Sequence, residues 1–356
     1  RNLDSGHVGP SALRSRRSAF MTIVRLLAAI STGLLIFFGL PANAEKPSLT
    51  VYTYASFVSD WGPGPLIEPA FEAHCQCDLK FVGVEDGAAL LGRLKLEGTR
   101  SSADVIVGLD TSLVAEARQT GLLDTHDLDL GTIDFALSWS DPVFIPYDFG
   151  YFGFVYDSDQ LAAPPKSLRA LVGDPEGPRI IIQDPRTSTP GLGLLLWVRK
   201  IFGEEDTAAW RALSPRIVTV TKGWSEAYGL FLEGEAPMVL SYTTSPAYHR
   251  HVENTDRYRV AMFEEGHYQQ IEVAARLAHS KQPELADDFL RFLLSDQVQT
   301  ILPTSNWMLP TVRMQQALPP AFHEDEIPRA ALSFEPTEVS AQRKHWIKRW
   351  LTALAQ

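Results

Sequence analysis

Apolar and polar positions along residues 49–123 form blocks whose period changes repeatedly between that of a strand and that of a helix. The apolar-rich runs at 49–54 and 79–84 predict strands, and ADVIVGLD at 103–110 predicts a fully buried strand. The runs at 66–75, 88–98 and 112–123 have the three-to-four spacing of amphipathic helices. Strands that alternate with helices in this way predict a parallel sheet in an α/β fold.

The pattern changes at residues 141–157, where DPVFIPYDFGYFGFVYD is aromatic and has no helical period. We expect an extended crossover between two lobes here. Strand–helix alternation then resumes, with strands predicted near 180–183, 217–220 and 238–242. A returning strand at 271–281, a helix at 283–299 and a C-terminal amphipathic helix at 339–354 follow, and we expect Trp346 and Trp350 to pack in the core.

These elements predict two lobes, and the chain crosses from one lobe to the other more than once. The first lobe comprises 45–145 and 270–325, and the second comprises 146–269 and 326–356, with crossovers near Phe149 and Val273. At 356 residues and 45% hydrophobic content, the chain is long enough for two cores of this size.

Residues 21–44, MTIVRLLAAISTGLLIFFGLPANA, have the layout of a secretory signal peptide. A single Arg25 precedes an apolar run, Pro41 breaks it, and Ala-Asn-Ala ends it. We expect 1–44 to be an N-terminal extension and signal peptide, with cleavage before Glu45 and a mature protein in the periplasm. A retained membrane anchor is the alternative, but the apolar run of about 15 residues is shorter than the roughly 20 that a span needs. The origin of residues 1–20 stays open.

The charge balance narrows the classes of partner. The formal net charge is −11, and removing residues 1–44 leaves 27 basic and 42 acidic residues, or −15. Such a chain is unsuited to nucleic acid or to anionic membranes. It is compatible with a cationic ligand.

Motifs of catalysis are missing from the sequence: there is no G-x-S-x-G elbow, no P-loop, no H-E-x-x-H and no spaced Cys/His set. The two cysteines, Cys75 and Cys77, lie beside acidic residues, which disfavour a reactive thiolate. We interpret them as a local structural bridge or as surface thiols. The sequence therefore predicts a binding protein that is not an enzyme and needs no metal or cofactor.

Aromatic and hydroxyl side chains gather at the ends of predicted strands, in VTVTKGWSEAY at 218–228 and LSYTTSPAY at 240–248. Tyr54, Asp86 and Asp110 also follow strands, and ligands of such sheets bind at the carboxyl ends of strands. Before Pro190, the hydroxyls of 187–189 suggest either an anion site at a helix start or plain helix capping. The alternative for the aromatic residues is a core with satisfied polar tips.

Longer blocks carry a resemblance to a known family. LTVYTY with the WGPGP turn, QDPRTSTPGLGLLLW, VTVTKGWSEAYGLFL, VLSYTTSPAYH, EGHY and NWM resemble the thiamine-binding group of extracytoplasmic solute-binding proteins, and they extend from residue 49 to about 308. The resemblance implies a two-lobed periplasmic-binding-protein fold of type II, each lobe a mainly parallel sheet flanked by helices. It implies capture of thiamine, its monophosphate or its diphosphate between the lobes and delivery to the permease and ATPase of an ABC importer. We expect a monomer.

The same resemblance implies a set of ligand contacts: Tyr54, Asp86, Gly87, Ser188, Trp224, Tyr242, Tyr248 and Trp307. Aromatic faces attract the permanent positive charge of the thiazolium ring by about 0.5–2 kcal/mol each. A carboxylate suits the aminopyrimidine or the thiazolium, and which of the two Asp86 takes stays open. The helix start at Ser188 and nearby tyrosine hydroxyls suit a phosphate tail.

Two other functions are compatible with the same architecture. A thiaminase-like enzyme would need a nucleophilic cysteine in the cleft, whereas Cys75 and Cys77 precede a strand at its far end. A ferric-ion-binding protein would need adjacent tyrosines, whereas Tyr242 and Tyr248 are six positions apart. The preference among thiamine and its phosphates, the redox state of the cysteines and the open or closed state of the lobes stay undecided at this level.

Overall fold

The computed structural model describes residues 45–130, 133 and 139–355. The predicted signal peptide therefore lies outside the described residues, and Lys46–Gln356 forms one compact unit. The strands are β1 (Ser48–Tyr54), β2 (Asp78–Val84), β3 (Val105–Asp110), β4 (Ile145–Asp157), β5 (Ile180–Gln183), β6 (Ile217–Thr221), β7 (Met238–Tyr242), β8 (Tyr258–Ala261), β9 (His267–Arg276), β10 (Leu309–Pro310) and β11 (Ala331–Leu332). The helices are α1 (Gly64–Cys75), α2 (Gly87–Glu97), α3 (Val114–Gln119), α4 (Leu168–Gly173), α5 (Thr189–Phe202), α6 (Asp206–Leu213), α7 (Trp224–Leu232), α8 (Pro246–Val252), α9 (Pro283–Leu293), α10 (Asp296–Ile301) and α11 (Pro336–Leu354).

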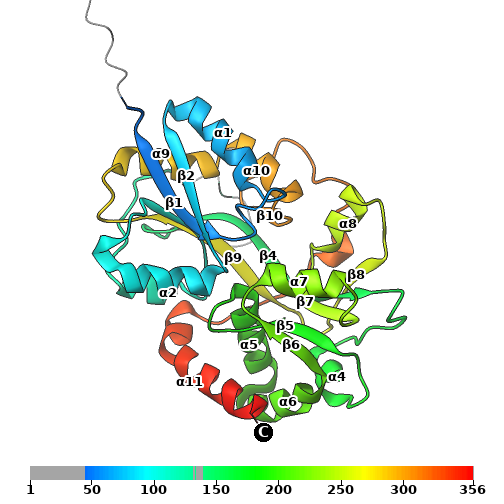
Figure 1. Cartoon of the computed structure of the whole chain (residues 1–356). Helices are drawn as coiled ribbons and strands as arrows, with labels where there is room; N and C mark the ends of the chain where they lie inside the picture. The colour runs from blue at the N-terminus through cyan, green and yellow to red at the C-terminus, as the bar shows by residue number, and fades with distance from the viewer. Residues whose placement is uncertain (1–44, 131–132, 134–138, 356) are drawn as a thin grey trace, which may run out of the picture. The chain divides into compact units, whose positions relative to one another are not determined.

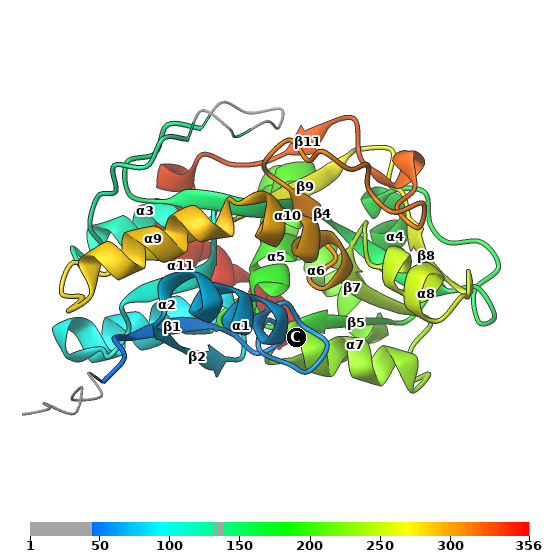
Figure 2. The same cartoon turned by 90° about the horizontal axis from the view of Figure 1, so that it is seen from above.

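Two parallel groups of strands flank a central antiparallel pair. The hydrogen-bonded order is β2-β1-β3-β9-β4-β7-β5-β6. β1 is parallel to β2 and β3, and β5 is parallel to β6 and β7. β9 and β4 lie between the groups and run antiparallel to each other and to their outer neighbours. Figures 1 and 2 show this arrangement. The strands β1 and β2 lie on one side of the central pair, β4 and β9, and β5 lies on the opposite side. The predicted α/β fold with two mainly parallel groups is confirmed.

The central strands carry the chain from one group to the other. β4 pairs with β9 through residues 145–151 and with β7 and β8 through residues 152–157. Phe149 and Val273, the predicted crossover points, lie in β4 and β9. The residue boundaries of the two lobes stay a prediction.

Alternation along the strands explains how the helices cover them. Val51 of β1 and Val105 of β3 pack in one cluster with Phe71 of α1 and Phe289 of α9. The next residues, Tyr52 and Ile106, point to the other face and pack in the cluster that holds the leucines of α2. Both faces of the sheet are therefore buried, as parallel strands require.

Two predicted helices are shorter than their hydrophobic pattern suggests. The run at 283–299 is divided into α9 and α10, because Ser295 adopts an extended conformation and its side chain accepts from the Val298 N–H to start a new helix. The run at 112–123 is helical only over α3, since Gly121 takes a positive φ of 66° two residues after the helix ends.

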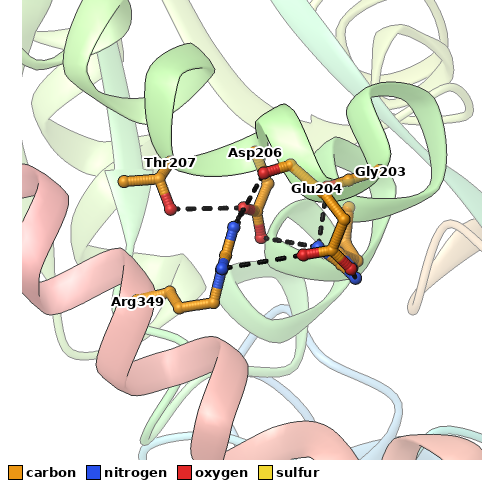
Figure 3. A network of polar contacts seen from close by, with 6 residues as sticks. Gly203, Glu204, Asp206, Thr207 and Arg349 are labelled. Carbon is orange, nitrogen blue, oxygen red and sulfur yellow. Dashed lines mark hydrogen bonds and ion pairs between the residues drawn. The ribbon is translucent and has the colours of Figure 1, made fainter.

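The C-terminal helix α11 is held against α6 and the 3₁₀ turn before it. Arg349 donates to the Asp206 carboxylate and, at 2.9 Å, to the Glu204 carbonyl, and Thr207 also donates to Asp206 (Figure 3). Trp350 packs edge-on against Trp210 of α6, with ring centroids 6.3 Å apart. Trp346 and Trp350 are both buried, which confirms their predicted core role.

Cys75 and Cys77 form a disulfide between the end of α1 and the start of β2. Of the two interpretations left open by the sequence, a local bridge is therefore the one that the structure contains. Across residues 45–130, 133 and 139–355, no helix has both the length and the apolar character to span a membrane.

Candidate functional site

A cavity of about 280 Å³ lies between the two parallel groups, beside the central strands. Its walls come from the ends of β1 and β7, the start of α2, helices α7 and α8, strand β9 and the loop before β10. The lining residues are Tyr54, Ser56, Trp61, Asp86, Trp224, Ser225, Tyr228, Gly229, Leu232, Tyr242, Ser245, Tyr248, Glu272, Asn306, Trp307 and Met308.

Tyr54 closes the cavity at the end of β1. A bulge in the β3–β9 pairing brings Gly108 beneath its ring, where Gly108 has a φ of +105°. A Cβ atom at Gly108 would lie 2.2 Å from Tyr54 Cδ1, so only glycine allows this close approach. The backbone of β3 therefore fixes the position of the Tyr54 ring.

Trp224 and Tyr228 make an aromatic wall on α7. They are four residues apart, so they share a helix face, and their rings stack with centroids 4.9 Å apart. The Trp224 indole Nε1 donates to Ser241 Oγ at 2.7 Å, which fixes the ring on β7. Trp61, from the loop after β1, approaches Trp224 with ring centroids 5.9 Å apart. This contact joins the loop after β1 to α7 at the side of the cavity.

Trp307 and Tyr248 form a second aromatic pair, with an edge-on arrangement and centroids 5.4 Å apart. Trp307 has a φ of +58°, a conformation that bulky residues rarely adopt and that costs about 1–3 kcal/mol. The hydroxyl of Thr244 donates to the Trp307 carbonyl at 2.6 Å and helps to hold the loop there. Strain at this position is consistent with a ring held in place for a ligand.

Asp86 caps α2 and also accepts hydrogen bonds from residues at the starts of α5 and α7. Ser188 Oγ donates to its carboxylate at 2.9 Å, and the backbone N–H groups of Gly87, Trp224 and Thr189 donate as well. Burial raises the pKa of Asp86 to about 6, and these hydrogen bonds oppose the rise. The carboxylate thus occupies the positive ends of both α5 and α7.

Gly87 is needed for this junction. A Cβ atom there would lie 2.3 Å from Thr189 Oγ1 and 2.6 Å from the Gly108 carbonyl oxygen. The start of α2 can therefore meet the start of α5 only with glycine at position 87.

A buried polar network forms the floor of the cavity. The Tyr54 hydroxyl donates to Glu272 Oε2 at 3.0 Å, and the Asn306 amide nitrogen lies 2.6 Å from Asp148 Oδ2 and 3.2 Å from Glu272 Oε2. Burial, and then the Asp148 charge, raise the pKa of Glu272 well above its ordinary value. Burial likewise raises the pKa of Tyr54, which keeps this phenol neutral.

Six of the eight predicted ligand contacts line the cavity together: Tyr54, Asp86, Trp224, Tyr242, Tyr248 and Trp307. Gly87 and Ser188 lie behind Asp86 instead, and Ser188 is fully buried. Asp110, which also follows a strand, is buried outside the lining, where burial and the Glu272 charge raise its pKa to about 7.

Sequence reasoning did not select several lining residues. Tyr228 had a usable signal, since it lies one helical turn after Trp224. Trp61 and Asn306 lie inside quoted blocks, but no local pattern distinguishes them. Glu272 is a single acidic residue in a buried strand, which is itself a signal because an unpaired buried carboxylate is costly.

The charge of the lining is one-sided. Asp86 and Glu272 are acidic, and none of the described lining residues is Lys, Arg or His. Within the described part of the chain, no group of three or more His, Cys, Asp or Glu side chains is arranged to hold a metal ion. The site suits a flat cation.

Comparison with known proteins gives the family. The protein family described as bacterial extracellular solute-binding protein matches residues 63–300 of this chain. The thiamine-binding periplasmic protein of Escherichia coli (strain K12) is 53% identical over 311 residues, which cover 87% of this chain and 94% of that protein. The chain belongs to the bacterial extracellular solute-binding protein family. The resemblance predicted from its sequence blocks is confirmed.

Solved structures agree with this membership. A structure titled periplasmic thiamin binding protein has a TM-score of 0.84 and 52% identity, covering 87% of this solute-binding chain and 97% of the other. A ferric binding protein from Campylobacter jejuni has a TM-score of 0.71 at 20% identity, covering 86% and 99%. At 20% identity, the similarity to the ferric binding protein shows only that the two proteins share a fold.

Proposed function

We propose that this chain captures thiamine and its phosphate esters in the periplasm and delivers them, chemically unchanged, to the permease and ATPase of an ABC importer. The relatives at about half identity carry thiamine-binding names, which supports the choice of ligand. The single observation that carries the proposal is the composition of the cavity, where seven aromatic side chains surround two carboxylates without a basic residue.

Each part of that cavity matches a part of thiamine. The thiazolium ring has a fixed positive charge, and its contact with tyrosine and tryptophan faces contributes about 0.5–2 kcal/mol per ring. Trp224 and Tyr248 come from α7 and α8, so two rings approach from separate helices. The flat aminopyrimidine suits a stacked position, and its amino group suits a carboxylate acceptor such as Asp86 or Glu272.

Binding of the phosphate esters rests on the helix ends near Asp86. The N–H groups at the start of α5 and α7 favour an anion. In this structure they donate hydrogen bonds to the Asp86 carboxylate. A phosphate tail must therefore share these donors with Asp86 or displace it, and we expect ionisation of Asp86 as pH rises through about 6 to lower ester affinity relative to thiamine affinity.

Absence of catalysis is part of the proposal. A thiaminase-like reaction needs a free nucleophilic thiol in the cleft. Both cysteines of the chain are joined in the disulfide at the start of β2, at the opposite end of the β1–β2 ladder from Tyr54. This placement supports the reading of a receptor that releases its ligand intact.

The ferric-ion alternative is less well supported by the site. Iron would need ionised tyrosines, whereas burial raises the pKa of Tyr54 and Tyr242 well above their ordinary values. We therefore assign the cavity to an organic cation rather than to iron.

Calorimetry of the purified protein tests this function directly. Thiamine, its monophosphate, its diphosphate and ferric citrate are titrated separately, and the ligand is then recovered and identified by mass spectrometry. We expect saturable one-to-one binding of thiamine and recovery of intact thiamine, without a charge-transfer band on adding iron. Cleaved products, or binding of iron alone, would contradict the proposal.

A further inference from the structure

Two carboxylates face each other across the central strands. Asp148 of β4 and Glu272 of β9 are direct partners in the antiparallel register, so their side chains share a face of the sheet. Asp148 is fully buried, whereas Glu272 is 5% exposed and lines the cavity. The two carboxyl groups lie within hydrogen-bond reach of each other.

Their surroundings supply neutral donors. Asn306 Nδ2 contacts both carboxylates, at 2.6 Å from Asp148 and 3.2 Å from Glu272, and Tyr54 donates to Glu272 at 3.0 Å. Neither carboxylate forms an ion pair with a basic side chain among the residues that the structure describes. Neutral donors stabilise one negative charge, but two adjacent buried carboxylates cannot both ionise without a large cost.

The neighbouring titratable groups do not supply the missing positive charge. Those that face Glu272 are Tyr54 of β1, Asp86 at the start of α2, Asp110 of β3, Tyr147 and Asp148 of β4, and Tyr242 of β7. All of them are neutral or negative. Arg343 of α11 acts on Asp110. A positive charge at the floor must therefore come from the ligand.

We propose that Asp148 and Glu272 hold one proton between them in the ligand-free protein and release it to solvent when a cationic ligand enters the cavity. The carboxyl O–H bond breaks, the proton leaves through the cavity to water, and the pair becomes two carboxylates whose added negative charge is balanced by the cation. This inference rests on the proposed function, because thiamine provides the fixed positive charge.

The directions of the pKa values agree with this geometry. Burial, and then the charge of Asp148, raise the pKa of Glu272, and burial raises the pKa of Asp148. An opposite charge within about 4–6 Å lowers the pKa of a carboxyl by about 1–3 units. The pair therefore binds its proton more weakly once the cation is present.

Linkage converts this difference into a pH dependence of affinity. Because the complex holds fewer protons than the ligand-free protein, thiamine binds more tightly as pH rises. Where one full proton is released, the affinity increases about tenfold per pH unit, and the rise levels off once the ligand-free pair has ionised.

The experiment counts protons with thiamine as the probe. Titration calorimetry at pH 7 in phosphate and in Tris gives the number released, since the observed enthalpies differ by that number times the difference in buffer ionisation enthalpy. We expect wild-type protein to release up to about one proton. Glu272→Gln and Asp148→Asn each leave a single carboxyl without its like-charged neighbour, and we expect both variants to release fewer protons than wild type.

Asp86→Asn is the matched control, because Asp86 also lines the cavity but lies outside the pair. It should weaken binding while leaving proton release intact. Loss of release in Asp86→Asn alone, or retained release in both pair variants, would overturn the inference.

Folding failure and binding failure are separated from the inference by two further readouts. Asp148→Asn does not alter the cavity lining, so it reports on the pair even if Glu272→Gln fails to fold by circular dichroism. The wild-type dissociation constant between pH 5.5 and 8.5 needs no variant, and a flat or falling affinity with rising pH would contradict the proton release. Absence of thiamine binding at every pH would instead contradict the proposed function.

Discussion

The Ser188 hydroxyl donates a 2.9 Å hydrogen bond to the Asp86 carboxylate, although the two residues are 102 positions apart in the chain. Ser188 caps α5, the helix that follows β5, and Asp86 caps α2, the helix that follows β2. One buried bond therefore joins the two helix starts beside the cavity. Ser188 contacts a carboxylate that lines the cavity and is itself fully buried.

Ser188→Ala removes this donor from a buried carboxylate. We expect the free energy of unfolding to fall by about 1–3 kcal/mol, because Asp86 loses a hydrogen bond to a charged group and α5 loses its cap. Thiamine affinity should fall as well, since the Asp86 carboxylate is no longer held in place. Urea unfolding and calorimetry measure the two effects.

Thr187→Ala is the control for that variant, because its hydroxyl donates to the Lys222 carbonyl and leaves Asp86 untouched. Equal thiamine affinity in Ser188→Ala, Thr187→Ala and wild type would show that the Ser188–Asp86 bond does not organise the site.

Asp86 should also give stability a pH dependence. Its folded-state pKa of about 6 exceeds its ordinary value of 3.8, so the folded protein holds this proton more tightly than the unfolded chain does. The resulting stabilisation is present at acid pH and is lost as pH rises through 6. Relative to Asp86→Asn, we expect wild type to lose about 2.4 kcal/mol of unfolding free energy between pH 4 and pH 7.

Urea titrations of both proteins across this range measure that difference. A gap between the two unfolding free energies that stays constant with pH would mean that Asp86 titrates normally in the folded protein.

Trp61 is 49% exposed, lines the cavity and approaches Trp224 from the loop after β1. We expect Trp61→Ala to speed thiamine dissociation about tenfold, equivalent to 1.4 kcal/mol, because the ligand loses one covering ring. Stability should change by no more than about 0.5 kcal/mol, as for other exposed side chains. Stopped-flow displacement provides the rate, and a wild-type rate would remove Trp61 from the binding surface.

The disulfide should be dispensable for binding. It closes a loop of only three residues, so reduction costs about 2 kcal/mol or less of stability in the chain-entropy model. It lies beside Asp78, at the opposite end of the β1–β2 ladder from Tyr54. Calorimetry after reduction and alkylation should return the wild-type thiamine affinity, and a lost site would show that the bridge shapes the cavity.

Local patterns were sufficient to predict most of the fold. The alternation of Val51 and Tyr52 between two faces, and the four-residue spacing on the helices, are properties of short segments. The predicted helix at 283–299 failed where a capping Ser295 competes with a continuous hydrophobic stripe. A helix cap requires only one residue in an extended conformation, and the spacing of apolar residues does not show which residue that is.

The site was predictable only where strand ends and sequence blocks indicate it. Tyr54 and Trp224 satisfy both conditions. Glu272 faces Asp148 through the register of strands that are more than 120 positions apart, and Ser188 meets Asp86 through a glycine-dependent contact between helix starts. Such pairings depend on tertiary geometry, which no local period encodes.

The most direct test of an aromatic cavity for a fixed cation is the thiamine affinity of Trp224→Ala, measured by calorimetry beside wild type. Leu96→Ala serves as the control, because Leu96 is 79% exposed on α2 and is absent from the cavity lining. We predict that Trp224→Ala stays folded and binds thiamine at least tenfold more weakly, a loss of about 1.4 kcal/mol, while Leu96→Ala binds like wild type. A Trp224→Ala protein that binds thiamine with wild-type affinity would contradict the account.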